Sequence, residues 1–146
     1  MHDLPRQLTA EELAELFEGR TRLVERLAKR DDPLGSAGAV IADLPEEEKL
    51  EALDAHPAIG AQRLSPRSAA EQGGGGDPTV LTELAYLNQV YEEKFGFRFV
   101  VFVNRRSKSE ILEILRARLE RTRQEELATG LEELVAIARD RWSTRS

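Results

Sequence analysis

Residues 77–103, DPTVLTELAYLNQVYEEKFGFRFVVFV, contain the two patterns that decide the fold. Asp77-Pro78 opens a helix, because proline suits the first helical position, and apolar residues then recur at helical spacing. The last nine residues, FGFRFVVFV, are aromatic and β-branched, which is typical of a buried extended segment. The rest of the chain offers no partner strand. We therefore predict an extended core segment, about residues 97–103, inside a helical protein.

Helix starts flank this stretch on both sides. Thr9 with Glu12, and Ser107 with Glu110, each form a capping box before an apolar run. Pro45 stands at a helix start and is followed by three glutamates, which the positive end of the helix dipole favours. The sequence predicts an all-α bundle of about seven to eight helices with one buried extended segment. No linker is long enough to divide residues 1–146, so we predict a single domain.

Composition excludes several classes of site. The chain has no cysteine, and its only histidines are His2 and His56, which excludes disulfides, thiolate nucleophiles and a histidine-rich zinc site. A carboxylate-only magnesium site stays open, although no acidic cluster has a recognisable spacing. We expect no metal and no cofactor.

Charge and hydropathy bear on partners and location. The net charge of −6 argues against nucleic-acid binding, and glutamates dilute the arginine-rich stretch 116–123. No apolar run approaches the length that spans a bilayer, and the first residues do not resemble a signal peptide. We expect a cytoplasmic protein that binds neither nucleic acid nor membrane.

The first candidate site is His56-Pro57. Proline disfavours the α conformation in the residue before it, so His56 is expected at the C-terminal end of the helix that starts at Pro45. The negative end of the helix dipole and the nearby Asp54 would raise the pKa of the imidazole, which suits a proton donor near neutral pH. The alternative is a helix-ending histidine that only caps carbonyl groups.

The second candidate is the stretch 68–72, SAAEQ. On a helix opened by Ser65-Pro66, positions 68, 71 and 72 share one face and present a hydroxyl, a carboxylate and an amide. Such a face suits a small ligand rich in N–H and C=O groups, and the alternative is a simple capping box. The glycines at 73–76 lack the Lys-Ser/Thr of a phosphate loop and are expected to form a hinge or lid.

Two further sets of residues have both a structural and a functional interpretation. The aromatic run 95–103 is either core packing or an irregular backbone whose N–H and C=O groups also bind a ring. Four arginines are each a solvated charge or, at a pocket mouth, a clamp for a carboxylate: Arg63, Arg118, Arg139 and Arg141.

In this order, the pieces resemble the 2-oxo-4-hydroxy-4-carboxy-5-ureidoimidazoline (OHCU) decarboxylases over roughly residues 9–142. No single piece is decisive, but the ordered set is specific. The resemblance rests on HPAIG at 56–60, Ser68 with Glu71-Gln72, Leu87-Asn88 with Tyr91, KFGF at 94–97, Phe99-Val100, Glu110-Ile111-Leu112, Arg118-Leu119, Glu126, Ile137-Ala138 and Arg141.

The resemblance implies an all-α enzyme of urate (purine) catabolism that decarboxylates OHCU to (S)-allantoin without cofactor or metal. It implies His56 as the general acid/base and Glu71 as the key carboxylate. The residues that it implies for binding the small-molecule ureide substrate are Pro57, Ser68, Ala69, Ala70, Glu71, Gln72, Phe99, Val100, Val101, Phe102, Val103 and Arg141. Family members often carry Asn-Gly-Arg where this chain has Asn104-Arg105-Arg106, which bears on the turn after the extended segment.

Alternatives to this function stay open at the level of sequence. The main rival is a non-catalytic helical ligand-binding or interaction module on the same fold, and the second is a lyase that acts on a related ureide. The oligomeric state is also open, with a homodimer as one candidate assembly.

Overall fold

The computed structural model describes residues 8–57 and 77–144, which form seven α-helices and no β-strand. The predicted all-α bundle with one extended segment is confirmed for these residues. The helix expected at Ser65-Pro66 and the glycines at 73–76 lie outside them. In chain order the helices are α1 (Ala10–Phe17), α2 (Arg22–Leu27), α3 (Ala37–Ala42), α4 (Glu46–Asp54), α6 (Pro78–Phe95), α7 (Lys108–Arg118) and α8 (Arg123–Thr144).

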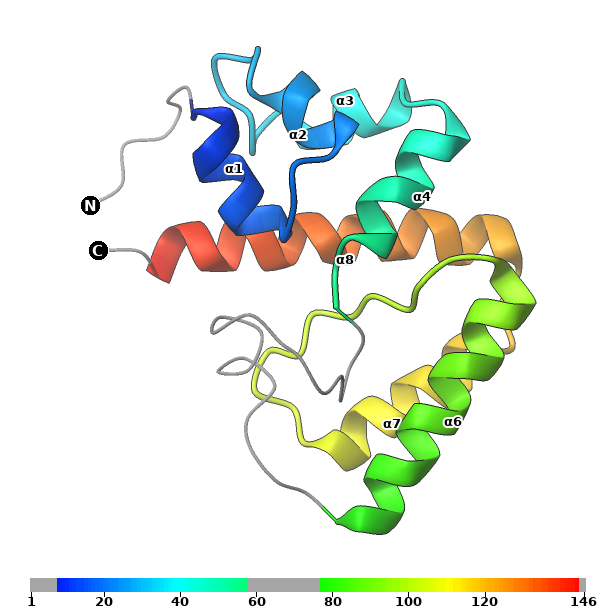
Figure 1. Cartoon of the computed structure of the whole chain (residues 1–146). Helices are drawn as coiled ribbons and strands as arrows, with labels where there is room; N and C mark the ends of the chain where they lie inside the picture. Colours follow the sequence, from blue (N-terminus) through cyan, green and yellow to red (C-terminus); the bar gives the residue numbers. More distant parts are fainter. Residues whose placement is uncertain (1–7, 58–76, 145–146) are drawn as a thin grey trace.

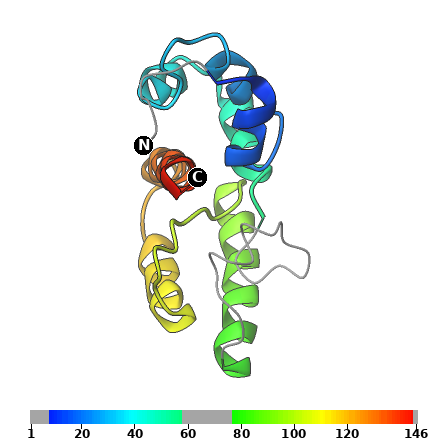
Figure 2. The ribbon, with the colours of Figure 1, turned by 90° about the vertical axis from the view of Figure 1, so that its left-hand side faces the viewer.

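Helix α8 crosses the middle of the molecule and divides the other helices into two groups. Helices α1 to α4 lie on one side of it, and the α6–α7 pair lies on the other (Figure 1). Figure 2 looks nearly along α8 and shows the same division, with the chain that joins α6 to α7 passing close to α8. The long C-terminal helix therefore lies between the two groups: α1, α3 and α4 pack directly on it, and the segment that joins α6 to α7 runs along its other side.

The predicted caps set the helix ends. In the first capping box, the Thr9 hydroxyl accepts from the Glu12 N–H at 3.1 Å, and the Glu12 carboxylate accepts from the Thr9 N–H at 3.0 Å. The Asp77 carboxylate accepts from the Thr79 N–H at 2.8 Å at the start of α6. Each such cap stabilises a helix by about 1 kcal/mol, so local sequence fixes these boundaries.

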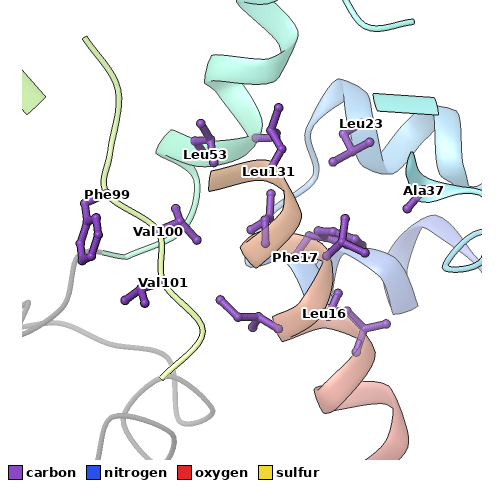
Figure 3. Close-up of a cluster of buried hydrophobic side chains, with 14 of the residues drawn as sticks. Leu16, Phe17, Leu23, Ala37, Leu53, Phe99, Val100, Val101 and Leu131 are labelled. Atoms are coloured by element: carbon purple, nitrogen blue, oxygen red, sulfur yellow. The ribbon is translucent and has the colours of Figure 1, made fainter. Parts of the chain in front are cut away.

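The core is built around α8. Buried side chains of α1, α2, α3 and α4 form one core with Leu131 of α8, and Val100 and Val101 lie on the side of this core away from Leu23 and Ala37 (Figure 3). Gly130 allows this close packing, because a Cβ at that position would lie 3.2 Å from Cδ2 of Leu53. Glycine inside a helix costs about 1 kcal/mol relative to alanine, and here it gives α4 room to approach.

Residues 97–103 form the predicted extended core segment. Phe97, Phe99, Val100 and Val101 are each at most 3% exposed, and the Phe99 ring lies 5.2 Å from that of Tyr91. Side chains take the place of a partner strand in satisfying the backbone. The Phe102 N–H donates to Glu133 at 3.1 Å, and the Val100 carbonyl accepts from Arg118 at 2.8 Å.

The turn after this segment keeps a left-handed backbone without the glycine that family members often carry. Asn104 has φ 48° and Arg105 has φ 66°. A residue with a Cβ is strained in this conformation by roughly 1–2 kcal/mol, and asparagine tolerates it better than arginine does. The missing glycine therefore leaves strain at Arg105.

A buried group of charges joins α6, α7 and α8. Its members, which we call the Glu126 cluster, are Tyr91, Arg118, Arg121 and Glu126. The fully buried Glu126 carboxylate accepts from the Tyr91 hydroxyl at 2.7 Å, from Arg118 Nε at 2.7 Å and from Arg121 Nη1 at 2.9 Å. Burial and the bond to Glu126 raise the pKa of Tyr91, so its hydroxyl stays a donor.

Candidate active site

His56 lies directly after the C-terminal end of α4, where the proline rule placed it. Its N–H still donates to the Leu53 carbonyl at 3.2 Å, and Pro57 then takes the chain away from the helix. The His56 side chain is buried, with 7% exposure for the residue, and Pro57 is half-buried. Imidazole Nδ1 has no hydrogen-bond partner within the part of the chain that the structure describes. A buried polar atom without a partner is costly, which makes it a candidate ligand contact.

Arg98, from the extended segment, caps the end of α4. Its Nη1 donates to the main-chain carbonyl of Asp54 at 3.1 Å and to that of His56 at 2.8 Å. Within residues 8–57 and 77–144 these carbonyls accept from no helical N–H, and a cation suits the negative end of the helix dipole. The guanidinium fills the role that the capping alternative gave to His56.

Arg141 and Glu18 form a buried ion pair. Arg141, on α8, is 1% exposed; its Nη1 donates to the Leu16 carbonyl at 3.1 Å, and its Nη2 lies 3.0 Å from the Glu18 carboxylate. Glu18 follows α1 in a left-handed conformation, with φ 65°. Strain of this kind persists where the surrounding contacts hold it, and functional sites are common among such places.

The expectation of a raised pKa at His56 is wrong. The pKa of His56 falls to about 4, mainly because burial penalises the charged imidazole. The nearby Arg141 cation lowers it further, Glu18 opposes this, and Arg98 adds a smaller decrease. We call Glu18, His56, Arg98 and Arg141 the His56 cluster; its imidazole is neutral at pH 7.

Asp54 does not supply the charge that the sequence suggested. Its carboxylate accepts from the main-chain N–H of Arg98 at 3.0 Å, which ties it to the extended segment. It therefore acts on the backbone that caps α4, and it is absent from the causes that shift the pKa of His56.

The backbone of residues 99–103 is partly occupied. The Phe102 carbonyl accepts from Arg106 Nη1 at 2.9 Å, and the Val103 carbonyl accepts from the Arg106 N–H at 2.9 Å. With the bonds at Val100 and Phe102 given above, this leaves Phe99 and Val101. Among the described residues the main chains of these two have no hydrogen-bond partner, although Phe99 is 1% and Val101 is 3% exposed. Within this stretch, Phe99 and Val101 are the positions where both backbone groups could bind a ring.

The structure brings some of the candidate residues together and leaves others outside the part of the chain that it describes. The capping bonds of Arg98 bring His56 beside the extended segment, and Arg141 acts on His56 electrostatically. Ser68, Ala69, Ala70, Glu71 and Gln72 lie outside the described residues, as does Arg63.

The interpretation of the arginines as separate solvated charges is wrong for two of them. Arg118 is 5% exposed and Arg141 is 1% exposed, because each pairs with a buried carboxylate. Arg139 is exposed and donates to the Leu34 carbonyl at 2.8 Å.

Sequence reasoning missed Glu18 and Arg98. Arg98 is the one charged residue in FGFRFVVFV, and a cation inside a buried run needs acceptors, so this position could have been identified. Glu18 gave no such indication, since its partner lies at the other end of the chain.

A groove of about 680 Å³ lies between α3, α4 and α8, lined by residues that include Ile41, Lys49, Leu131 and Glu132. No member of the His56 cluster lines it, so it is separate from this site.

In residues 8–57 and 77–144, no group of three or more His, Asp or Glu side chains is placed to hold a metal ion. No helix within those ranges is long and apolar enough to cross a membrane.

Comparison with known proteins gives related sequences. The chain is 28% identical to the uric acid degradation bifunctional protein PucL of Bacillus subtilis (strain 168), over 97% of this chain and 31% of that protein. It is 31% identical to the 2-oxo-4-hydroxy-4-carboxy-5-ureidoimidazoline decarboxylase of Halalkalicoccus jeotgali, over 67% of this chain and 58% of that protein. The chain thus spans less than two thirds of the length of these relatives.

Solved structures show the same fold. A crystal structure of OHCU decarboxylase in the presence of (S)-allantoin matches with a TM-score of 0.75 and 24% identity, over 89% of this chain and 94% of that one. A crystal structure of (S)-allantoin synthase matches with a TM-score of 0.68 and 23% identity, over 90% of this chain and 47% of that one. At these identities the likeness concerns the fold alone. The family model described as OHCU decarboxylase matches residues 2–143, nearly the whole chain, and on that match the chain belongs to the OHCU decarboxylase family.

Proposed function

We propose that this chain is a carboxy-lyase that converts OHCU to (S)-allantoin in urate catabolism without a cofactor. The observation that carries the proposal is the buried neutral imidazole of His56, whose Nδ1 has no partner among the described residues, in a chain of this family. A scaffold histidine would be expected to have its buried nitrogen satisfied.

The substrate supplies its own electron sink. When CO₂ leaves, the electron pair of the broken bond forms a double bond to the neighbouring ring carbon. The electron pair of the ring C=N bond moves to its nitrogen, which takes up one proton. The 4-hydroxyl proton then moves to the neighbouring ring carbon as the hydroxyl becomes a carbonyl. A neutral imidazole suits this transfer, because it can accept the hydroxyl proton and then donate a proton to one face of the carbon. Delivery to one face gives a single enantiomer.

The other candidate residues bind the substrate. Glu71, with Ser68 to Gln72, grips the ring and ureido N–H groups, Phe99 to Val103 supplies backbone contacts, and Pro57 lines the site. Arg141 faces the substrate carboxylate. Its ion pair with Glu18 weakens that attraction. The weaker attraction favours the reaction, because tight binding of the departing carboxylate would stabilise the ground state and slow the reaction.

The remaining expectations concern the chain as a whole. We propose that residues 1–146 form one domain, that the protein is cytoplasmic, and that a homodimer is a candidate assembly. We also propose that it does not bind nucleic acid. Each arginine of the stretch 116–123 is already paired with a glutamate, which leaves little free charge for phosphates: Arg116 with Glu83 and Glu113, Arg118 and Arg121 with Glu126, and Arg123 with Glu46.

The test is to generate fresh substrate from urate with the two preceding enzymes, add the chain, and follow circular dichroism. Uncatalysed decay of the substrate gives racemic allantoin with no lasting signal, so the proposal predicts faster formation of optically active allantoin. Racemic product at the uncatalysed rate would favour a non-catalytic module on this fold. Optically active product from a related ureide alone would favour a different lyase.

A further inference from the structure

Arg98 occupies an unusual place in the extended core segment. Its neighbours Phe97 and Phe99 are buried, whereas the Arg98 side chain is 30% exposed and turns toward the end of α4. The residue is 42 positions from His56 in the chain, so the contact joins two remote segments. The side chain makes polar contacts here instead of packing in the core, and its Nε also lies 3.6 Å from the Glu92 carboxylate.

The contacts between Arg98 and α4 form a reciprocal clasp. The Arg98 guanidinium donates to the carbonyls of Asp54 and His56, while the Asp54 carboxylate accepts from the main-chain N–H of Arg98 at 3.0 Å. One arginine thereby holds both the last turn of α4 and the peptide group of His56, which follows that turn. Because Pro57 offers no N–H, the chain after His56 cannot be held by a helical bond at that position.

The imidazole needs such support. Nδ1 of His56 has no partner in residues 8–57 or 77–144, so no bond from there fixes the ring through that nitrogen. The orientation of the ring then depends on the backbone that carries it and on the packing around it. A backbone clamp on the His56 carbonyl therefore orients the catalytic group without occupying it.

We propose that Arg98 is a positioning residue for the reaction, which holds the His56 backbone through its bonds to the Asp54 and His56 carbonyls. The inference rests on the proposed function for its catalytic part, while the clamp itself is a statement about His56 in the free protein. Arg98 also sets the charge near the ring. The charges that act on His56 from the packed elements are Glu18 after α1, Arg141 on α8 and Arg98 in the extended segment.

Arginine suits this position better than lysine does. The planar guanidinium presents several N–H donors in a fixed geometry, so one side chain can hold two carbonyls at once. A lysine keeps the charge but loses that geometry. The comparison of Arg98→Lys with Arg98→Ala therefore separates the charge from the clamp.

The kinetic test compares Arg98→Ala, Arg98→Lys and a matched control, Arg26→Ala. Arg26 also holds α4, through bonds from Nε and Nη2 to Glu48 at 2.9 and 3.3 Å, but near the opposite end from His56. Arg98→Ala should lower kcat by about tenfold or more with KM changed by less than about threefold, since small misplacement of a reacting group is costly. Arg98→Lys should recover part of kcat, and Arg26→Ala should stay within about twofold of wild type.

A second readout does not depend on substrate. The chain has two histidines, so NMR titration of the His56 ring can be assigned by comparison with His56→Gln. Its midpoint should lie near 4 in the wild type and rise in Arg98→Ala, because a cation is removed; it should stay near the wild-type value in Arg98→Lys and in Arg26→Ala. If Arg98→Ala does not fold, Arg98→Gln replaces it, since its amide can still donate to one carbonyl.

The outcomes separate the two proposals. Wild-type kcat in Arg98→Ala overturns the positioning role, and an unmoved His56 midpoint in that variant overturns the electrostatic action of Arg98 on the ring. If the wild-type chain itself produces no optically active allantoin, the proposed function fails and the catalytic part of this inference fails with it. The titration then decides only whether Arg98 acts on the His56 ring in the free protein: a raised midpoint in Arg98→Ala supports this, and an unchanged one overturns it.

Discussion

The Glu126 cluster and the His56 cluster each bury arginine charge beside a glutamate, but they differ in what they leave unsatisfied. In the Glu126 cluster the carboxylate itself accepts three hydrogen bonds from three side chains, and it is fully buried. In the His56 cluster the Arg141–Glu18 pair is satisfied, while the imidazole beside it has a buried nitrogen without a partner among the described residues. Arg118 Nη2 of the Glu126 cluster also has no partner among the described residues, but it belongs to a guanidinium whose Nε and Nη1 are bonded and which cannot act as a base. His56 Nδ1 belongs to a neutral imidazole, which can.

This difference indicates which cluster carries chemistry. A buried carboxylate that accepts three hydrogen bonds stabilises and specifies the packing of helices, and its oxygens are already occupied. A buried neutral base that lacks a partner lowers stability and is retained where a substrate completes it. At pH 7, stability should therefore respond mainly to changes in the Glu126 cluster, and the reaction rate to changes in the His56 cluster.

The largest expected effect is on stability, from Glu126→Ala. The change leaves Arg118, Arg121 and the Tyr91 hydroxyl without their shared acceptor, and breaking a buried ion pair in this way costs about 3–5 kcal/mol in the free energy of unfolding. Urea unfolding at pH 7 measures it. Glu132→Ala, at an exposed position of the same helix, is the control and should change stability by less than about 0.5 kcal/mol. A loss below about 1 kcal/mol for Glu126→Ala would show that the network is dispensable to the fold.

The second effect concerns pH. The pKa of His56 is about 4 in the folded protein against 6.5 ordinarily, so between these values the unfolded chain binds a proton that the folded protein does not. Stability from this group is therefore fully present above pH 6.5 and is lost as the pH falls toward 4, by about 3 kcal/mol. The difference between wild type and His56→Gln isolates it from the carboxylates, which also titrate. Parallel stability curves for the two proteins would contradict the neutral, buried imidazole.

The third effect is on rate, and it should leave the Glu126 cluster untouched. His56→Ala and Glu71→Ala should each lower the rate of formation of optically active allantoin by at least about 100-fold, the scale of general acid–base catalysis. Near-normal turnover in either variant would remove that residue from its assigned role. Glu132→Ala is again the control, with unchanged turnover expected.

Local patterns in the sequence predicted the fold well. Capping boxes at Thr9 and Ser107 and the Pro45 helix start needed only neighbouring residues, and so did the extended character of residues 97–103. The position of His56 at a helix end followed from Pro57 in the same way. Such features depend on interactions over three or four residues, which a single sequence displays directly.

The electrostatics of the site could not be predicted in this way. The pKa of His56 depends on burial and on three charges that lie 38 to 85 positions away in the chain: Glu18, Arg98 and Arg141. A prediction of the His56 pKa from the helix end takes into account only the helix dipole and Asp54. In the structure the Asp54 carboxylate accepts a hydrogen bond from the Arg98 N–H. Burial lowers the pKa of His56 more than the helix dipole raises it, because removing the imidazolium charge from water costs more free energy than the field of one short helix provides.

The smallest effect lies outside both clusters, at the turn that follows the extended segment. Arg105→Gly should raise the free energy of unfolding by a few tenths of a kcal/mol, because glycine removes roughly 1 kcal/mol of left-handed strain but costs nearly as much in chain entropy. Arg105→Ala keeps the Cβ and should gain nothing, which makes it the matched control. Neither variant should change turnover, since Arg105 belongs to neither cluster. A loss of turnover in Arg105→Gly alone would mean that the rigidity of this turn, and not only the clasp at Arg98, sets the position of the extended segment against His56.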